Sequence, residues 1–395
     1  MKRILFSAIA ASAILSASAQ QAIWGAPNVV SPQVNEDKTV TFRFVSPAAK
    51  EVSVTGDFLP TRKIDTPFGK FDAPGEAGLT KNGNVWEFTT TPLSPELYSY
   101  SFVVDSVKIN DPLNVFQIRD TGTVTNVFLV KGGYADDYAV NDVPHGTVSK
   151  IWYPSKTFGT NRRLTVYTPA GYEDNKEQKY PVFYLLHGMG GDENAWSELG
   201  RATQILDNMI ARGAVKPMIV VMPNGNSDLQ AAPGESSLGF TPPTTALPRT
   251  MDGSFEEAFP EIVDFIDSHY RTIPEKSSRA IAGLSMGGFH SRFISEEYPD
   301  MFDYVGLFSA ALLPREGATA KVYQNIDKKL ALQFEKKPKL YWIGIGNTDF
   351  LYDANKAYRK QLDEKKYPYT YLETPEGHIW KNWRIYLREF LPLLF

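Results

Sequence analysis

The stretch that decides the fold reads AIAGLSMGGF and occupies residues 280–289. An apolar run ends at Ser285, with Gly283 two places before it and Gly287 two places after it. A serine at the tip of a sharp strand-to-helix turn has a strained backbone, and the flanking positions leave no room for side chains. This is the GxSxG spacing of a nucleophile elbow, which places the hydroxyl at a helix N-terminus, where negative charge is favoured.

The motif alone is weak evidence for a catalytic serine. At about 7% glycine and 7% serine, a bare GxSxG occurs by chance roughly once in eight chains of this length. Its meaning therefore depends on whether a base, an acid and a second oxyanion donor are present elsewhere in the chain.

The base has to be one of five histidines. We expect it to be His378, which follows the last predicted strand in the segment EGHIW, because the α/β-hydrolase order is serine, acid, histidine. His290, five residues after Ser285, would reach the site only with difficulty, and His187 lies in an HG turn that more often supports a loop. Of the two others, His145 is expected in the linker and His269 near the end of a helix.

The acid is expected between the serine and the histidine, after the next-to-last strand. Asp349 follows the apolar run 340–345, and a carboxylate at the end of that strand can hold the His378 imidazole in the useful tautomer. Asp353 is the close competitor, and two further carboxylates remain possible: Glu373 and Glu376.

Acyl transfer also needs backbone donors for the oxyanion. One is the N–H of Met286, directly after the nucleophile. The other is expected in residues 185–191, which read LLHGMGG, because glycines let the backbone approach a substrate oxygen. We predict the N–H of Met189 as this second donor.

From Thr147 onward the pattern alternates strands with helices, which predicts an α/β domain with a mostly parallel sheet. Nearly continuous apolar runs indicate strands buried on both faces. The expected strands are 164–167, 182–186, 218–222, the apolar run that ends at Ser285, 304–309, 340–345 and 369–373, with helices at 255–269, 354–363 and from Trp380.

Residues 29–130 instead show short strands with turn signals between them, which predicts a small all-β sandwich. The expected strands are 39–44, 51–54, 85–89, 98–104 and 123–129. Glycine, aspartate and proline in residues 131–147 indicate a linker that few apolar contacts cross. The domain organisation is therefore a sandwich at 20–130, a linker at 131–147 and an α/β domain at 148–395.

Lys2 and Arg3 precede an apolar run and then the small residues 17–19, which is the pattern of a secretory signal peptide at 1–19. We expect a secreted or periplasmic protein with no membrane span. Without Lys2 and Arg3 the formal charge changes from −4 to −6, with 39 basic against 45 acidic residues, so nucleic acid is not an expected partner. The chain has no cysteine, hence no disulfide.

Two resemblances follow from these motifs. VTGDF at 54–58, Trp86, the alternating aromatics of 98–104 and Asp111-Pro112 resemble the early-set sandwich domains that precede carbohydrate-active domains, including glycogen-binding types. This implies glycan docking; the alternative is that Trp86 and the tyrosines fill the sandwich core.

The segments VPHG at 143–146, YTP at 167–169, HGMGG at 187–191 and GLSMGG at 283–288, with Asp349 and Gly377-His378, resemble the esterase D-like α/β-hydrolases. Within them they are most similar to the carbohydrate esterase family of feruloyl and acetyl xylan esterases, over about residues 143–395.

That resemblance implies a serine carboxylic-ester hydrolase with Ser285 as nucleophile, Asp349 as acid and His378 as base, acting on feruloylated or acetylated xylan. Feruloyl groups are favoured; acetyl xylan esterase, siderophore esterase and a non-catalytic glycan-binding protein are the alternatives. Trp196 and Trp380 are candidate substrate-binding residues, as are Phe240 and Trp383. No HExxH motif is present, so no metal or other cofactor is expected, and the oligomeric state stays open.

Overall fold

The structure is a computed structural model that describes residues 28–66, 69–245 and 247–395. The expected signal peptide at 1–19 lies outside the described residues. The chain divides into two compact units. One contains the described residues up to Leu93 together with Ser101–Val115, and the other contains Ser94–Tyr100 and Phe116–Phe395.

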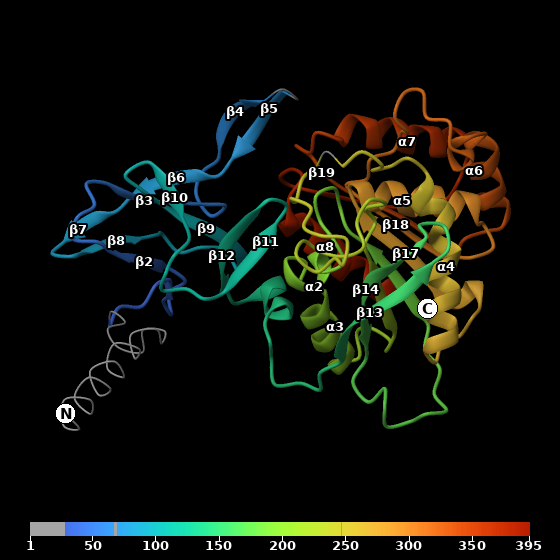
Figure 1. Cartoon of the computed structure of the whole chain (residues 1–395), viewed down its shortest axis with the longest axis horizontal. Coiled ribbons are helices and arrows are strands. Elements are labelled where there is room, and N and C mark those ends of the chain that lie inside the picture. Colours follow the sequence, from blue (N-terminus) through green and yellow to red (C-terminus); the bar gives the residue numbers. More distant parts are fainter. Residues whose placement is uncertain (1–27, 67–68, 246) are drawn as a thin grey trace, which may run out of the picture. The chain divides into compact units, whose positions relative to one another are not determined.

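The first unit is built of β-strands, which confirms the predicted all-β N-terminal region (Figure 1). Strands β1, β2, β8 and β7 form one antiparallel sheet in that order, β3 pairs with β6, and β4 pairs with β5. The strands are β1 (Gln33–Val34), β2 (Val40–Val45), β3 (Val52–Gly56), β4 (Arg62–Thr66), β5 (Gly69–Ala73), β6 (Gly75–Gly78), β7 (Thr80–Asn82), β8 (Val85–Thr89), the end of β9 (Glu96–Val104) and β10 (Val107–Ile109).

Aromatic side chains fill the core of this unit. Phe42 and Phe102 are fully buried, and Trp86 is buried with its indole N–H donating to the Ser46 carbonyl oxygen at 3.1 Å. Trp86 therefore offers no open ring face, which favours the core interpretation of this residue over glycan docking.

The second unit contains an eight-stranded sheet in the order β13-β14-β16-β15-β17-β18-β19-β20. The strands from β16 to β20 are parallel, while β14 runs antiparallel to both of its neighbours. The bounds are β13 (Thr147–Ser155), β14 (Thr160–Thr168), β15 (Val182–Leu186), β16 (Ile219–Pro223), β17 (Arg279–Leu284), β18 (Tyr304–Phe308), β19 (Leu340–Gly346) and β20 (Thr370–Thr374). This is the predicted α/β-hydrolase type of sheet.

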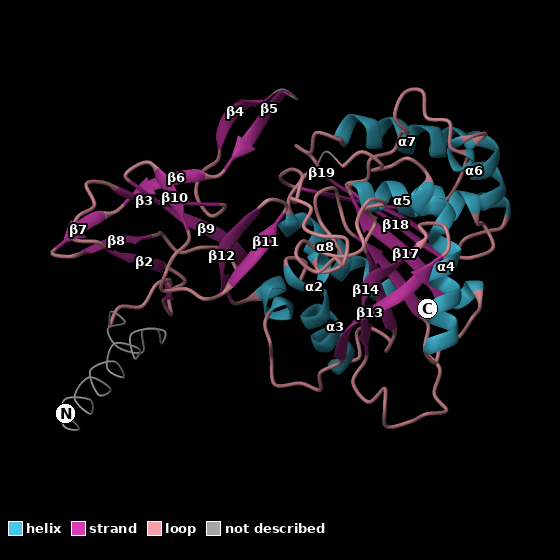
Figure 2. Ribbon diagram, viewed as in Figure 1, coloured by secondary structure: helices cyan, strands magenta, loops and turns pink. Residues whose placement is uncertain are grey.

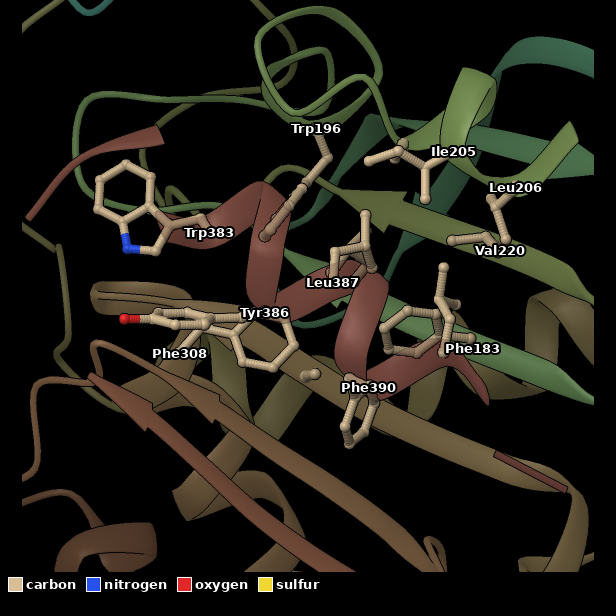
Figure 3. Packing of buried hydrophobic residues seen from close by; sticks show 14 of the residues in the cluster. Phe183, Trp196, Ile205, Leu206, Val220, Phe308, Trp383, Tyr386, Leu387 and Phe390 are labelled. Carbon is tan, nitrogen blue, oxygen red and sulfur yellow. The ribbon is translucent and has the colours of Figure 1, made fainter. Parts of the chain in front are cut away.

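Helices cover both faces of this sheet (Figure 2). Alternate residues of each buried strand point to opposite faces, so Phe183 packs with α3 and α8 whereas Tyr184 packs with α4 and α7. The close-up in Figure 3 shows the first of these clusters, with side chains of α3, α8 and the sheet interdigitated. The helices are α2 (Ala195–Glu198), α3 (Ala202–Ala211), α4 (Ser254–His269), α5 (Met286–Glu297), α6 (Ile326–Glu335), α7 (Tyr352–Glu364) and α8 (Trp380–Phe390).

Two β-strands lie in this unit ahead of the eight-stranded sheet: β11 (Gln117–Asp120) and β12 (Thr123–Val130), with β12 pairing with the start of β9. The segment 131–147 differs from the expected linker with few apolar contacts. It contains the 3₁₀ helix η2 (Gly133–Tyr138), whose Ala135 and Tyr138 are fully buried in the cluster with α3 and α8. Tyr134 and Tyr138 read alike among the glycines and aspartates, so the sequence did not show that Tyr138 and the small Ala135 are the residues that pack.

Candidate active site

Ser285 lies between β17 and α5 with φ 54° and ψ −112°. Such a backbone costs about 1–3 kcal/mol for a residue other than glycine and persists only where its surroundings enforce it. Here the Ser285 N–H donates to the Phe308 carbonyl at 2.9 Å, and the Ser285 carbonyl accepts from Ala311 at 3.1 Å. The end of β18 and the segment that follows it thus fix the serine in the elbow conformation.

The two glycines of the elbow are required by contact as well as by conformation. A Cβ atom at Gly287 would lie 2.3 Å from the Leu186 carbonyl oxygen, and one at Gly283 would lie 2.5 Å from the Gly287 backbone. Both distances are far inside van der Waals contact, so a side chain at either position would push the turn away from β15. The GxSxG pattern therefore reflects close approach of three backbone segments.

Asp349 and His378 form a hydrogen-bonded pair. The distance from His378 Nδ1 to Asp349 Oδ2 is 2.9 Å, and the Asp349 side chain is fully buried. Asp349 Oδ1 accepts from the Leu351 N–H at 2.9 Å, which fixes the carboxylate plane. Because a carboxylate accepts the Nδ1 proton, the other ring nitrogen, Nε2, is left with a lone pair that can accept a hydroxyl proton.

The competing carboxylates have other surroundings. Asp353 is exposed in the first turn of α7, Glu373 accepts from Tyr352 and Tyr371, and Glu376 pairs with Lys381. Among the four candidate acids in the described residues, Asp349 alone has a hydrogen bond to His378.

The sheet brings the three candidate residues to one edge. Ser285, Asp349 and His378 follow β17, β19 and β20, which are parallel and lie within three strand positions of one another. Since the carboxyl ends of parallel strands meet at the same edge, all three residues lie on loops or turns there.

The loop after β15 passes directly beside the elbow. A Cβ atom at Gly188 would lie 3.4 Å from Ser285 Cβ and 2.4 Å from Leu284 Cδ1. Within the residues that the structure describes, neither Met189 nor Met286 donates its backbone N–H to another group. Both N–H groups are therefore unpaired within the described part of the chain, which is what the prediction of two oxyanion donors requires.

His187 supports this loop. Its Nε2 accepts a hydrogen bond from the Gly225 N–H at 2.8 Å, so the proton resides on Nδ1, which donates to the Gly188 carbonyl at 2.7 Å. Burial lowers the pKa of His187 to about 4, which keeps the imidazole neutral. With both ring nitrogens occupied by backbone groups, His187 positions the loop.

A second support, which sequence reasoning missed, is the turn between β11 and β12. Arg119 forms an ion pair with Asp192, whose side chain is buried, and a Cβ atom at Gly190 would lie 2.7 Å from Thr121 Cγ2. The turn therefore contacts the loop after β15, residues 187–192, from outside the eight-stranded sheet; this loop is called the Met189 loop below. The strands expected from the sequence include 123–129 but none at 117–120, where β11 lies, so no sequence signal distinguished this turn.

Asp120 belongs to the same turn, and its carboxylate accepts a hydrogen bond from the indole N–H of Trp380. The residue is exposed, yet protein surrounds it on most sides, and the resulting desolvation raises the pKa of its carboxyl.

The candidate substrate-binding aromatics differ in exposure. Trp196 is 1% exposed, and its indole N–H donates to the Leu186 carbonyl at 2.9 Å, so it packs beneath the site as part of the core. Trp380 is half-buried and lies edge-on to both Trp196 and Trp383, while the Trp383 ring lies 4.9 Å from that of His378. Phe240 is exposed on the loop after β16.

Similarity to known proteins identifies the family. Residues 155–394 match the family described as "Putative esterase". The chain belongs to this esterase family. Its members are carboxylic-ester hydrolases, in agreement with the resemblance drawn from the motifs.

Two further similarities concern a relative and a solved structure. The chain is 32% identical over 311 residues to an endo-1,4-beta-xylanase/feruloyl esterase of Xylanibacter ruminicola, with 76% of this chain and 39% of that protein covered. It is 28% identical to a ferulic acid esterase structure with a TM-score of 0.51, over 63% of this chain and 97% of that one.

The enterobactin esterase of Shigella flexneri shares the fold at 17% identity, with a TM-score of 0.60 over 90% of this chain and 92% of that one. The chain spans about two fifths or less of the length of the first curated relatives that it matches.

Two features bear on cofactors and membranes. Among the described side chains, no group of three or more histidines or carboxylates is placed to hold a metal ion. A search of the same residues finds no helix with the length and apolar character needed to cross a bilayer.

Proposed function

We propose that the chain is a secreted or periplasmic serine esterase that removes feruloyl or related hydroxycinnamoyl groups from plant cell-wall xylan. The observation that carries the chemistry is the 2.9 Å bond between His378 and the buried Asp349, at the sheet edge that also carries the strained Ser285. The similarity to proteins described as feruloyl esterases supports the acyl group.

The proposed reaction has two acyl-transfer steps. Ser285 Oγ attacks the ester carbonyl carbon while His378 Nε2 takes the hydroxyl proton, and the N–H groups of Met189 and Met286 stabilise the negative oxygen. The tetrahedral intermediate collapses, the ester C–O bond breaks, and His378 returns the proton to the departing sugar hydroxyl.

In the second step, water loses a proton to His378 and attacks the acyl-enzyme carbonyl carbon. Collapse breaks the bond to Ser285 Oγ, which regains the proton, and the acid leaves. Asp349 stays ionised throughout and stabilises the imidazolium cation that forms in each step.

The test compares methyl ferulate with acetylated xylan under identical conditions. Faster turnover of methyl ferulate supports the feruloyl assignment. Faster release of acetate would instead make acetylated xylan the preferred substrate. Absence of turnover with both esters and with short p-nitrophenyl esters would favour a non-catalytic glycan-binding protein. Ser285→Ala should abolish turnover and leave the thermal unfolding midpoint close to that of the unchanged protein.

A further inference from the structure

A shallow groove of about 630 Å³ lies away from the candidate active site, between the β13–β14 hairpin and the loop after β16. Trp152 and Leu238 line it and are 43% and 72% exposed. Its other lining residues include Asn161, Thr160 and Ser237, and every described residue that lines it has an uncharged side chain.

The polar side of the groove is held rigid. Gln230 is buried; its amide donates to the Thr160 hydroxyl at 2.6 Å, and its oxygen accepts from the Ser237 hydroxyl at 3.0 Å. These bonds fix the hairpin against the loop. Asn161 is exposed beside them, and its side-chain amide makes no hydrogen bond to another described residue.

The groove lies at the same edge of the sheet as Ser285. β13 runs in the direction of β16, and the pairing of Leu164 with Pro223 leaves residues 160–163 projecting beyond the end of β16. From β14 to β17 the sheet order counts three strand spacings, a lateral separation of roughly 14 Å. A polymer several sugar units long can span that separation.

We infer that this groove binds a neutral stretch of the polysaccharide that carries the ester. The Arg163 guanidinium lies over the Trp152 ring, 5.9 Å from its centroid, and is buried in an ion pair with Glu193. The exposed part of the indole offers apolar surface to the C–H face of a pyranose ring, and the amide and hydroxyl groups pair with the hydroxyls of the sugar. The absence of charge among the described lining residues disfavours acidic glycans and nucleic acids. This inference rests on the proposed action on a polysaccharide ester.

The experiment measures glycan binding in a chain that cannot turn over. Full-length protein with Ser285→Ala is titrated with xylohexaose by calorimetry and run in gels containing soluble arabinoxylan. Adding Trp152→Ala should weaken binding roughly tenfold, the loss expected of an aromatic anchor; Trp152→Phe should restore most of it. Tyr134→Ala, which removes an aromatic side chain 49% exposed elsewhere in the same unit, should leave binding unchanged.

Unchanged affinity in Trp152→Ala would overturn the inference, as would failure of the Ser285→Ala parent to bind either glycan. Thermal unfolding of each variant shows whether it is folded. Binding is measured in the Ser285→Ala protein, and ferulate release is measured separately in the unchanged protein. If glycan binding depends on Trp152 but the unchanged protein releases no ferulate, the proposed function alone is rejected. If the unchanged protein releases ferulate but glycan binding does not depend on Trp152, the groove alone is rejected.

Discussion

At the scale of single residues, the proposed chemistry depends on the pairing of Asp349 with His378. Asp349→Asn keeps the size of the side chain but presents an amide that can donate to His378 Nδ1. This favours the tautomer with its proton on Nε2, which cannot accept the serine proton. We expect kcat for methyl ferulate to fall by about 10⁴, as when the buried aspartate of another triad is replaced. The matched control is Asp353→Asn, four residues away and exposed, which should retain most of the rate. A larger loss in the control would reassign the acid.

Gly287 gives a second prediction at this scale. Gly287→Ala forces a methyl group against the Leu186 carbonyl oxygen at 2.3 Å, and we expect a loss of about 1–3 kcal/mol in the free energy of unfolding. Urea denaturation measures it. Gly78→Ala is the control, because a Cβ atom at Gly78 would have nothing within 4 Å and the backbone there has no positive φ. Equal stabilities of the two variants would contradict the steric account of the elbow.

At the scale of elements, the sequence predicted strands where apolar runs are buried on both faces. The run 182–186 matches β15 residue for residue, and 304–309 and 340–345 differ from β18 and β19 by one residue. The sequence did not predict that the β11–β12 turn contacts the Met189 loop, because the ion pair between Arg119 and Asp192 joins residues 73 positions apart. Local periodicity carries no information about such a contact.

The contact between the β11–β12 turn and the Met189 loop can be tested by mutation. Arg119→Met removes the cation that pairs with the buried Asp192, and the uncompensated carboxylate should loosen the Met189 loop. We expect kcat to fall about tenfold with a smaller change in KM, because the oxyanion donors act in the transition state. Arg43→Met, in an ion pair with the half-exposed Glu87, is the control and should change neither constant. A rise in KM alone would assign the turn to substrate binding.

At the scale of the whole molecule, stability should respond to acid through His187. The unfolded histidine titrates near pH 6.5 and the folded one near pH 4, so between these values the unfolded state binds more protons. The contribution of His187 is fully present above pH 6.5 and is lost as the pH falls toward 4, by up to about 3 kcal/mol. Urea unfolding of His187→Gln should show a shallower loss over this range. The same slope in both proteins would mean that His187 is protonated in the folded chain, which its bond from Gly225 opposes.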